Sequence, residues 1–166
     1  LIYEGMAIPR QISPIPESPQ YYEKLSKSNI EFDPDLSNKI MDDLGYTEKN
    51  AEGYRLWKDG SGQEVSFTVQ NTGEADRTKG LEMLTEYFAA IGIKLHVKPV
   101  QRNAYDENCR NNEIEASFWG AGRTYMVYKD PREFIGTQVD RPWIVAWALW
   151  RLNPDNPAAE EPAQDS

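Results

Sequence analysis

Residues 111–125, with the sequence NNEIEASFWGAGRTY, bring together side chains suited to contact a solute. An apolar run ends at Trp119, and two glycines, an arginine and a tyrosine follow within six residues. An indole face stacks on sugar rings or lines an apolar pocket, and a guanidinium binds a carboxylate through two parallel hydrogen bonds. A further arginine lies in the sequence DPREF. The candidate ligand-binding residues are therefore Trp119, Gly120, Gly122, Arg123, Tyr125 and Arg132.

Each of the candidate side chains also has a purely structural explanation. The position of Trp119 is also explained by a core tryptophan at the end of a strand. The positions of Arg123 and Tyr125 are also explained by ordinary surface residues of a glycine loop. Loops on a rigid scaffold often carry binding residues, which keeps a ligand-facing role open for them. Arg132 fits a structural salt bridge as well as a site for a ligand carboxylate. The sequence leaves both explanations open.

Residues for catalysis or metal binding are scarce in this chain. Cys109 is the one cysteine and His96 the one histidine, so no internal disulfide can form, and neither a His-based triad nor a zinc site is expected. The phosphate-binding fingerprints GxGxxG and GxxxxGK[ST] are absent from the sequence. We therefore predict that the protein is not an enzyme and carries no catalytic residue, metal or cofactor.

The composition is that of a soluble globular domain. The chain has 166 residues, of which 39% are hydrophobic and 27% charged, and this length suffices for one domain with one core. No apolar run approaches the length of a membrane-spanning helix. The net charge of −9 argues against nucleic-acid binding, because a phosphate-binding face needs clustered Lys and Arg.

The two ends of the chain differ from its middle. The chain begins at Leu1 without a signal-peptide pattern, and we expect a segment of a larger protein whose targeting signal lies outside it. Four prolines between positions 9 and 19 forbid a long helix, so residues 1–31 are expected to be extended. The acidic tail 153–166 is rich in Pro and Ala and is expected to be flexible.

The pattern of apolar residues predicts a helix, a hairpin and a β-α-β-α-β unit. Asp33 and Pro34 are typical of a helix start and Gly45 of a helix end, which predicts a helix over 34–44. The sequence DGSG between two alternating arms predicts a hairpin over 53–71 whose second arm is the stronger strand. The elements of the β-α-β-α-β unit are expected at 64–70, 76–91, 93–99, 102–112 and 115–119.

This alternation places Trp119 at a position where open α/β folds bind ligands. Short connections between alternating strands and helices predict an α/β fold with a mainly parallel sheet flanked by helices. Ligands of such sheets lie beyond the carboxyl ends of the strands. Trp119 is the last residue of the third expected strand, which favours a ligand-facing role.

The sequence PWIVAWALW predicts a helix over 142–150 with three tryptophans at helical spacing. Trp143, Trp147 and Trp150 are four and three residues apart. Such a face packs in a core, packs against another part of the protein, or forms an exposed apolar patch through which the chain self-associates. A self-contained interaction module that uses this helix is the alternative function.

In order and spacing, five stretches resemble a known family: YEGMAIP, FDPDLSNKIMDDLGY, AEGYRLWKDGSGQEVSFTVQ, LTEYFAAIGIKLHVKPVQRNAY and NEIEASFWGAG. The family is that of the extracellular solute-binding proteins of ABC importers, family 5, which take up oligopeptides, dipeptides and nickel. The resemblance covers about residues 1–150 and is to the larger, substrate-covering lobe.

The resemblance implies transport rather than catalysis. Residues 1–152 would form one α/β lobe of a two-lobed protein, with an extended segment over 1–31 and the α/β core over 32–152. The ligand would be enclosed between the two lobes and delivered to a membrane permease. The location would be periplasmic or extracellular, with a lipid anchor in the full-length form.

The residues after Trp119 depart from the pattern of peptide-binding members. Those members carry an Asp within a few residues of the Trp, and it holds the α-ammonium group of the peptide. Here Gly122 and Arg123 occupy that stretch, and Asp130 matches the family's downstream DP instead. A buried ammonium group needs an anionic partner. The departure argues against a free peptide amine and favours a sugar, a modified peptide or an anionic solute.

Overall fold

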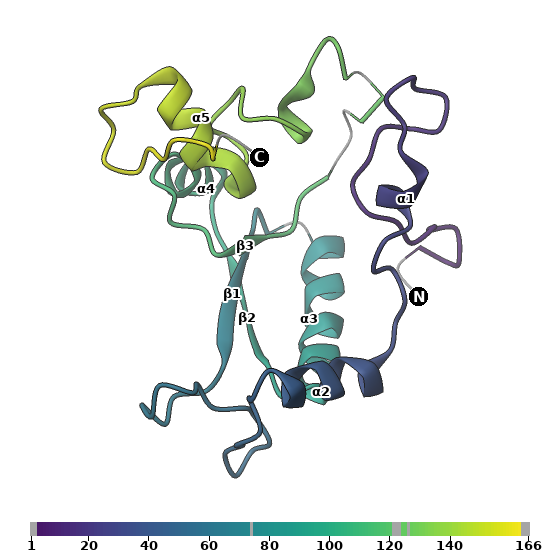
Figure 1. Cartoon of the computed structure of the whole chain (residues 1–166), viewed down its shortest axis with the longest axis vertical. Coiled ribbons are helices and arrows are strands. Elements are labelled where there is room, and N and C mark those ends of the chain that lie inside the picture. Colours follow the sequence, from purple (N-terminus) through teal and green to yellow (C-terminus); the bar gives the residue numbers. More distant parts are fainter. Residues whose placement is uncertain (1–2, 74, 121–123, 126, 164–166) are drawn as a thin grey trace. The chain divides into compact units, whose positions relative to one another are not determined.

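The computed structural model describes residues 3–73, 75–120, 124–125 and 127–163 (Figure 1). The chain divides into two compact units, each described by itself. The sheet unit comprises Glu31–Gln101 and Glu115–Phe118. The tryptophan unit comprises Leu1–Ile30, Arg102–Ile114 and Trp119–Ser166, and it holds four of the five tryptophans.

A three-stranded parallel sheet forms the centre of the sheet unit. Strand β1 (Ser66–Asn71) lies between β2 (Lys94–Pro99) and β3 (Ala116–Ser117), and it runs parallel to both. Helix α3 (Ala75–Ala90) connects β1 to β2 along the chain. The predicted α/β fold with a parallel sheet is therefore confirmed. β3 is shorter than the predicted strand 115–119, and its pairing ends where Phe118 N donates to Gln70 O at 3.2 Å.

The core of the sheet unit lies where α3 packs on β1 and β2. Leu81 is 1% exposed and packs with Val69 of β1 and Leu95 of β2. Partly buried side chains surround these three: Phe67, Leu84, Phe88, Val97, Ala116 and Phe118. The helical spacing of the α3 residues and the alternation along the strands direct these side chains to one place.

Helix α2 (Pro34–Asp43) begins as predicted but leaves its apolar residues exposed. Asp33 Oδ1 accepts a hydrogen bond of 2.8 Å from Leu36 N, and Pro34 occupies the first turn. The contact with the end of α3 is polar, since Asn38 Nδ2 donates to Ala90 O at 3.1 Å. Leu36, Ile40 and Leu44 retain exposed fractions of 51%, 49% and 56%.

The predicted hairpin over 53–71 is reduced to a short antiparallel contact. Leu56 bridges to Glu64, but the first arm is not a strand. Arg55 O accepts from Val65 N across the hairpin at 2.7 Å, but Arg55 N donates to Gly92 O at 2.7 Å. Because this N–H group bonds to the loop before β2, a regular ladder does not form along the first arm.

The tryptophan unit consists of short helices and irregular segments. The extended segment contains one helical turn that was not predicted, α1 (Glu23–Ser26), and α4 (Arg102–Arg110) lies within the predicted range 102–112. The 3-10 turns η1 (Pro131–Glu133) and η2 (Pro142–Ile144) precede α5 (Val145–Leu152), the helix predicted over 142–150. No helix in the described parts of the chain is long and apolar enough to cross a membrane.

A core position for the three tryptophans of the α5 region is wrong. Trp143, Trp147 and Trp150 are 47%, 40% and 38% exposed, and the buried residues are Val145, Ala148 and Leu149. A Cβ atom added to Gly136 would lie 3.0 Å from Ala148 N. The inner face of α5 therefore meets a loop backbone at close range, where an indole would not fit.

Candidate functional site

Trp119 contacts two side chains of α4. Its ring stacks on Tyr105 with a centroid distance of 5.0 Å and an interplanar angle of 15°. The guanidinium carbon of Arg102 lies 4.6 Å from the Trp119 ring centroid, within cation–π distance. Arg102 also donates to Asp106 at 2.9 Å through Nε. We call these four residues the Trp119 cluster.

The spacing along α4 explains how the Trp119 cluster forms. Arg102 and Tyr105 are three residues apart, so they lie on neighbouring turns of one helix face. Tyr105 is 2% exposed and stacks on the indole, whereas Trp119 itself is half-buried. Sequence reasoning missed Arg102 and Tyr105 as site residues, although their spacing on the helix that precedes the strand of Trp119 was available as a signal.

Cys109 lies one turn beyond Tyr105 on the buried face of α4. Its exposed fraction is 0%, and burial raises the pKa of its thiol. The thiolate is the nucleophilic form of cysteine, so both burial and the raised pKa suppress its reactivity. The site therefore offers no activated cysteine.

Labelling of Cys109 by iodoacetamide tests this packing. At pH 7.5 we expect the folded protein to react about a hundredfold more slowly than the protein in 6 M guanidinium chloride, because reaction requires local opening. Mass spectrometry of quenched samples follows the reaction. Equal rates in the two states would show that the packing of α4 around Tyr105 is wrong.

Tyr125 lies in a different setting, beside the extended N-terminal segment. It is 62% exposed and borders a hollow of about 340 Å³. The other residues that line the hollow are Ile15, Glu17, Ser18, Pro19, Gln20, Val127, Tyr128 and Lys129. A hydrogen bond joins the amide of Gln20 to the hydroxyl of Tyr128. The proline-rich segment thus supplies polar groups beside Tyr125, which its composition did not indicate.

Arg132 belongs to a network of charged side chains. It donates from Nε to Asp130 at 2.7 Å and from Nη1 to Asp140 at 2.9 Å, and it is largely buried. Arg141 pairs with Glu133 at 2.8 Å and with Asp140 at 3.1 Å. The hydrogen bond to Asp130 raises the pKa of Arg132 above its ordinary value. We call these five residues the charge cluster, and they favour the salt-bridge explanation of Arg132.

The remaining candidate residues are Gly120, Gly122 and Arg123. Gly120 is exposed, with no neighbouring atom within 4 Å of an added Cβ, whereas Gly122 and Arg123 lie outside the described residues. The described candidates thus occupy separate settings: Trp119 in its cluster, Tyr125 at the hollow and Arg132 in the charge cluster. In the described parts of the chain, no three His, Cys, Asp or Glu residues are grouped as a metal site would require.

Comparison with known proteins gives a family and a fold. The model of the family described as bacterial extracellular solute-binding proteins, family 5 Middle, matches residues 1–141. No curated protein matches the chain. The oligopeptide-binding protein OppA is 25% identical with a TM-score of 0.80, over 98% of this chain. The chain spans 26% of that protein's length.

Two further solved structures share the fold. The oligopeptide-binding protein AppA from Bacillus subtilis, in complex with a nonapeptide, is 19% identical with a TM-score of 0.60, over 96% of this chain and 32% of its own. A periplasmic oligopeptide-binding protein from Thermotoga maritima, bound to mannohexaose, is 24% identical with a TM-score of 0.55. That alignment covers 68% of this chain and 22% of the Thermotoga protein.

Proposed function

Because this chain belongs to the bacterial extracellular solute-binding proteins, family 5, we propose that it is part of a protein that captures a solute for an ABC importer. The similarity to OppA over 98% of the chain is the observation that carries this proposal. The whole protein would enclose the solute between two lobes and present it to a permease. Closure would follow from the tighter binding of the solute to the closed state.

The chain would contribute one lobe to this protein. Residues 1–152 would form the lobe, and 153–166 would be a flexible tail. A periplasmic or extracellular location follows from the family, and a lipid anchor in the full-length form is part of the proposal. The isolated chain would bind solute weakly, since the opposite lobe supplies the other contacts.

The Trp119 cluster supports a solute with a flat or ring-shaped face. The half-buried indole of Trp119 beside Tyr105 would form an aromatic wall for such a solute, and the 56% exposed side chain of Arg102 would offer donors for oxygen acceptors. Asp106 already pairs with Arg102, so it is not the free carboxylate that a peptide ammonium group would need. We therefore propose an oligosaccharide, or a peptide whose amino terminus does not lie at Trp119. The structure of the Thermotoga protein with mannohexaose bound supports an oligosaccharide as the solute.

Solute binding by the full-length protein tests the proposal. Oligosaccharides, free peptides and N-acetylated peptides are screened by thermal shift, because a ligand of the folded state raises the melting temperature with its concentration. Calorimetry on the hits should show about tenfold weaker binding for Trp119→Ala, the loss typical of a buried aromatic contact. Trp147→Ala is the matched control and should bind normally.

The outcomes separate the proposal from its alternative. If no solute class raises the melting temperature, solute capture is wrong. If binding is found and Trp119→Ala retains full affinity, the site is wrong although the function stands. The exposed tryptophans at 143, 147 and 150 favour the alternative of an interaction module or a self-associating chain. That alternative gains support if Trp147→Ala removes an association and no solute binds.

A further inference from the structure

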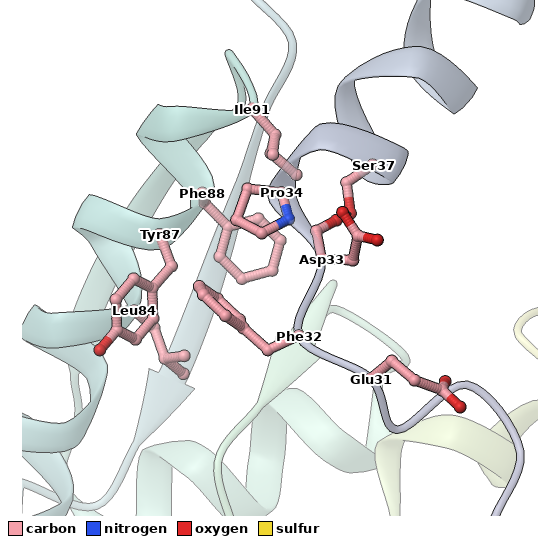
Figure 2. Close-up of a pocket in the computed structure, with 9 residues that line it drawn as sticks. All are labelled: Glu31, Phe32, Asp33, Pro34, Ser37, Leu84, Tyr87, Phe88 and Ile91. Atoms are coloured by element: carbon pink, nitrogen blue, oxygen red, sulfur yellow. The ribbon is translucent and has the colours of Figure 1, made fainter.

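An apolar groove lies in the sheet unit between α3 and the segment that enters α2 (Figure 2). It has a volume of about 270 Å³. The side chains from α3 are Leu84, Tyr87, Phe88 and the adjoining Ile91, and those on the α2 side are Glu31, Phe32, Asp33, Pro34 and Ser37. Of the candidate solute-binding residues that the structure describes, Trp119, Gly120, Tyr125 and Arg132, none lines this groove.

Aromatic contacts give the groove a defined shape. Phe32 and Tyr87 meet edge to face with ring centroids 5.2 Å apart, and Phe88 meets Phe67 in the same manner at 5.2 Å. Below the groove, Phe67 and Phe88 pack against the core of the sheet unit. The Asp33 cap fixes the chain direction directly after Phe32. The floor of the groove is therefore preformed.

Two aromatic side chains of the groove are unusually exposed for apolar groups. Phe32 is 72% exposed and Tyr87 is 45% exposed. Leu36 and Ile40 of α2, and Leu44 directly after it, are exposed as well. A cluster of large apolar side chains on one surface is typical of a contact with another molecule. Burial of these rings would be favourable, since apolar area removed from water contributes about 25 cal/mol per Å².

The size and charge of the groove indicate what it accepts. Its volume lies below the range of about 300–1,000 Å³ that small-molecule sites occupy, which suits one bulky side chain. Glu31 and Asp33 line the groove, and Asp35 follows in the first turn of α2. No cationic side chain is among the described residues that line the groove. A complementary occupant carries positive charge beside its apolar group.

We propose that this groove docks a polypeptide segment of a partner protein that inserts a bulky apolar side chain next to lysine or arginine. The apolar side chain packs between Phe32 and Phe88 and displaces water from both rings. The basic neighbour pairs with Glu31 and Asp33 at the rim. Charge complementarity selects this partner over acidic segments, and the aromatic floor selects it over hydrophilic ones.

Fluorescence anisotropy with labelled peptides and the full-length protein tests this docking surface. The probe is an acetylated, amidated peptide with the central sequence KKFKK, and its two controls are KKAKK and EEFEE. We expect KKFKK to bind, with affinity that falls as salt is added, and each control to bind about tenfold more weakly or not at all. Phenethylamine is added as a competitor that carries the same two chemical groups without a polypeptide.

Variants at the rim locate the binding. Phe32→Ala removes an exposed ring, and Glu31→Lys reverses an exposed charge without entering the core, so that variant remains informative if Phe32→Ala proves unstable. Both should weaken KKFKK by about tenfold, as expected for a central contact. Glu48→Lys, an exposed charge reversal outside the groove, and Tyr128→Ala, in the tryptophan unit, should leave binding unchanged.

Several results would overturn the proposal. These are no binding of KKFKK, equal binding of either control peptide, or unchanged binding by both rim variants. Competition by phenethylamine at the affinity of the peptide would identify a small-cation site instead of a docking surface. Solute binding is measured in the same variants. Its retention in Glu31→Lys would show that the two sites are separate.

Discussion

Arg55→Met should lower the free energy of unfolding of the sheet unit by about 3–5 kcal/mol, the loss expected when a buried charged network loses its centre. Arg55 is 1% exposed, and its guanidinium joins two separate segments. It donates to Ile91 O at 2.9 Å, to Asn38 Oδ1 at 2.8 Å, and to Tyr46 O. Methionine fills similar space but leaves these acceptors without their donor, which costs about 1–3 kcal/mol for each acceptor that stays buried.

The measurement is urea denaturation followed by circular dichroism, with Asp42→Asn as the control. Asp42 accepts from Arg55 at 2.5 Å, but its side chain is 55% exposed. Water therefore screens this ion pair, and its loss should cost about 1 kcal/mol or less. If Asp42→Asn destabilises as much as Arg55→Met, then the ion pair dominates and the carbonyl contacts do not.

Gly92 shows how closely the chain fits around Arg55. Its φ of +79° favours glycine, and an added Cβ would lie 2.8 Å from Arg55 Cγ. Gly92 follows shortly after the last residue of α3, and nothing in the residues around it indicates that an arginine packs against it. The contact brings together residues that are 37 positions apart.

Elements set by local rules were predictable from the sequence. The Asp33 cap and Pro34 fix the start of α2, and the spacing of Leu81, Leu84 and Phe88 fixes the inner face of α3. Short connections between alternating elements were enough to predict the parallel sheet. In each of these cases the signal lies in the elements themselves and in the short connections between them.

Packing between distant segments was not predictable. Three tryptophans at helical spacing suggest a core face, but the close approach of Gly136 to Ala148 reserves the inner side of α5 for small and branched residues. The site shows the same limit. Trp119 was a candidate because it ends an expected strand, whereas its stacking on Tyr105 depends on how α4 packs in the folded unit.

In the tryptophan unit, Arg141→Met should lower the free energy of unfolding by about 3–5 kcal/mol, because it leaves the carboxylate of Glu133 buried without its partner. Glu133 accepts from Arg141 at 2.8 Å and 3.2 Å, and the two side chains are 1% and 6% exposed. This geometry holds both oxygens of the carboxylate, so no other donor can replace the guanidinium without movement of the chain.

The double variant Arg141→Met, Glu133→Leu separates loss of the charge pair from loss of packing. Replacement of a whole buried pair by apolar residues of similar size is often neutral, so the double variant should recover most of the stability that Arg141→Met loses. Tryptophan fluorescence in a urea titration reports on this unit, which contains four of the five tryptophans. A double variant as unstable as the single one would contradict this account. It would show that the pair matters for the path of the chain between η1 and η2, where Asp140 joins Arg141 to Arg132.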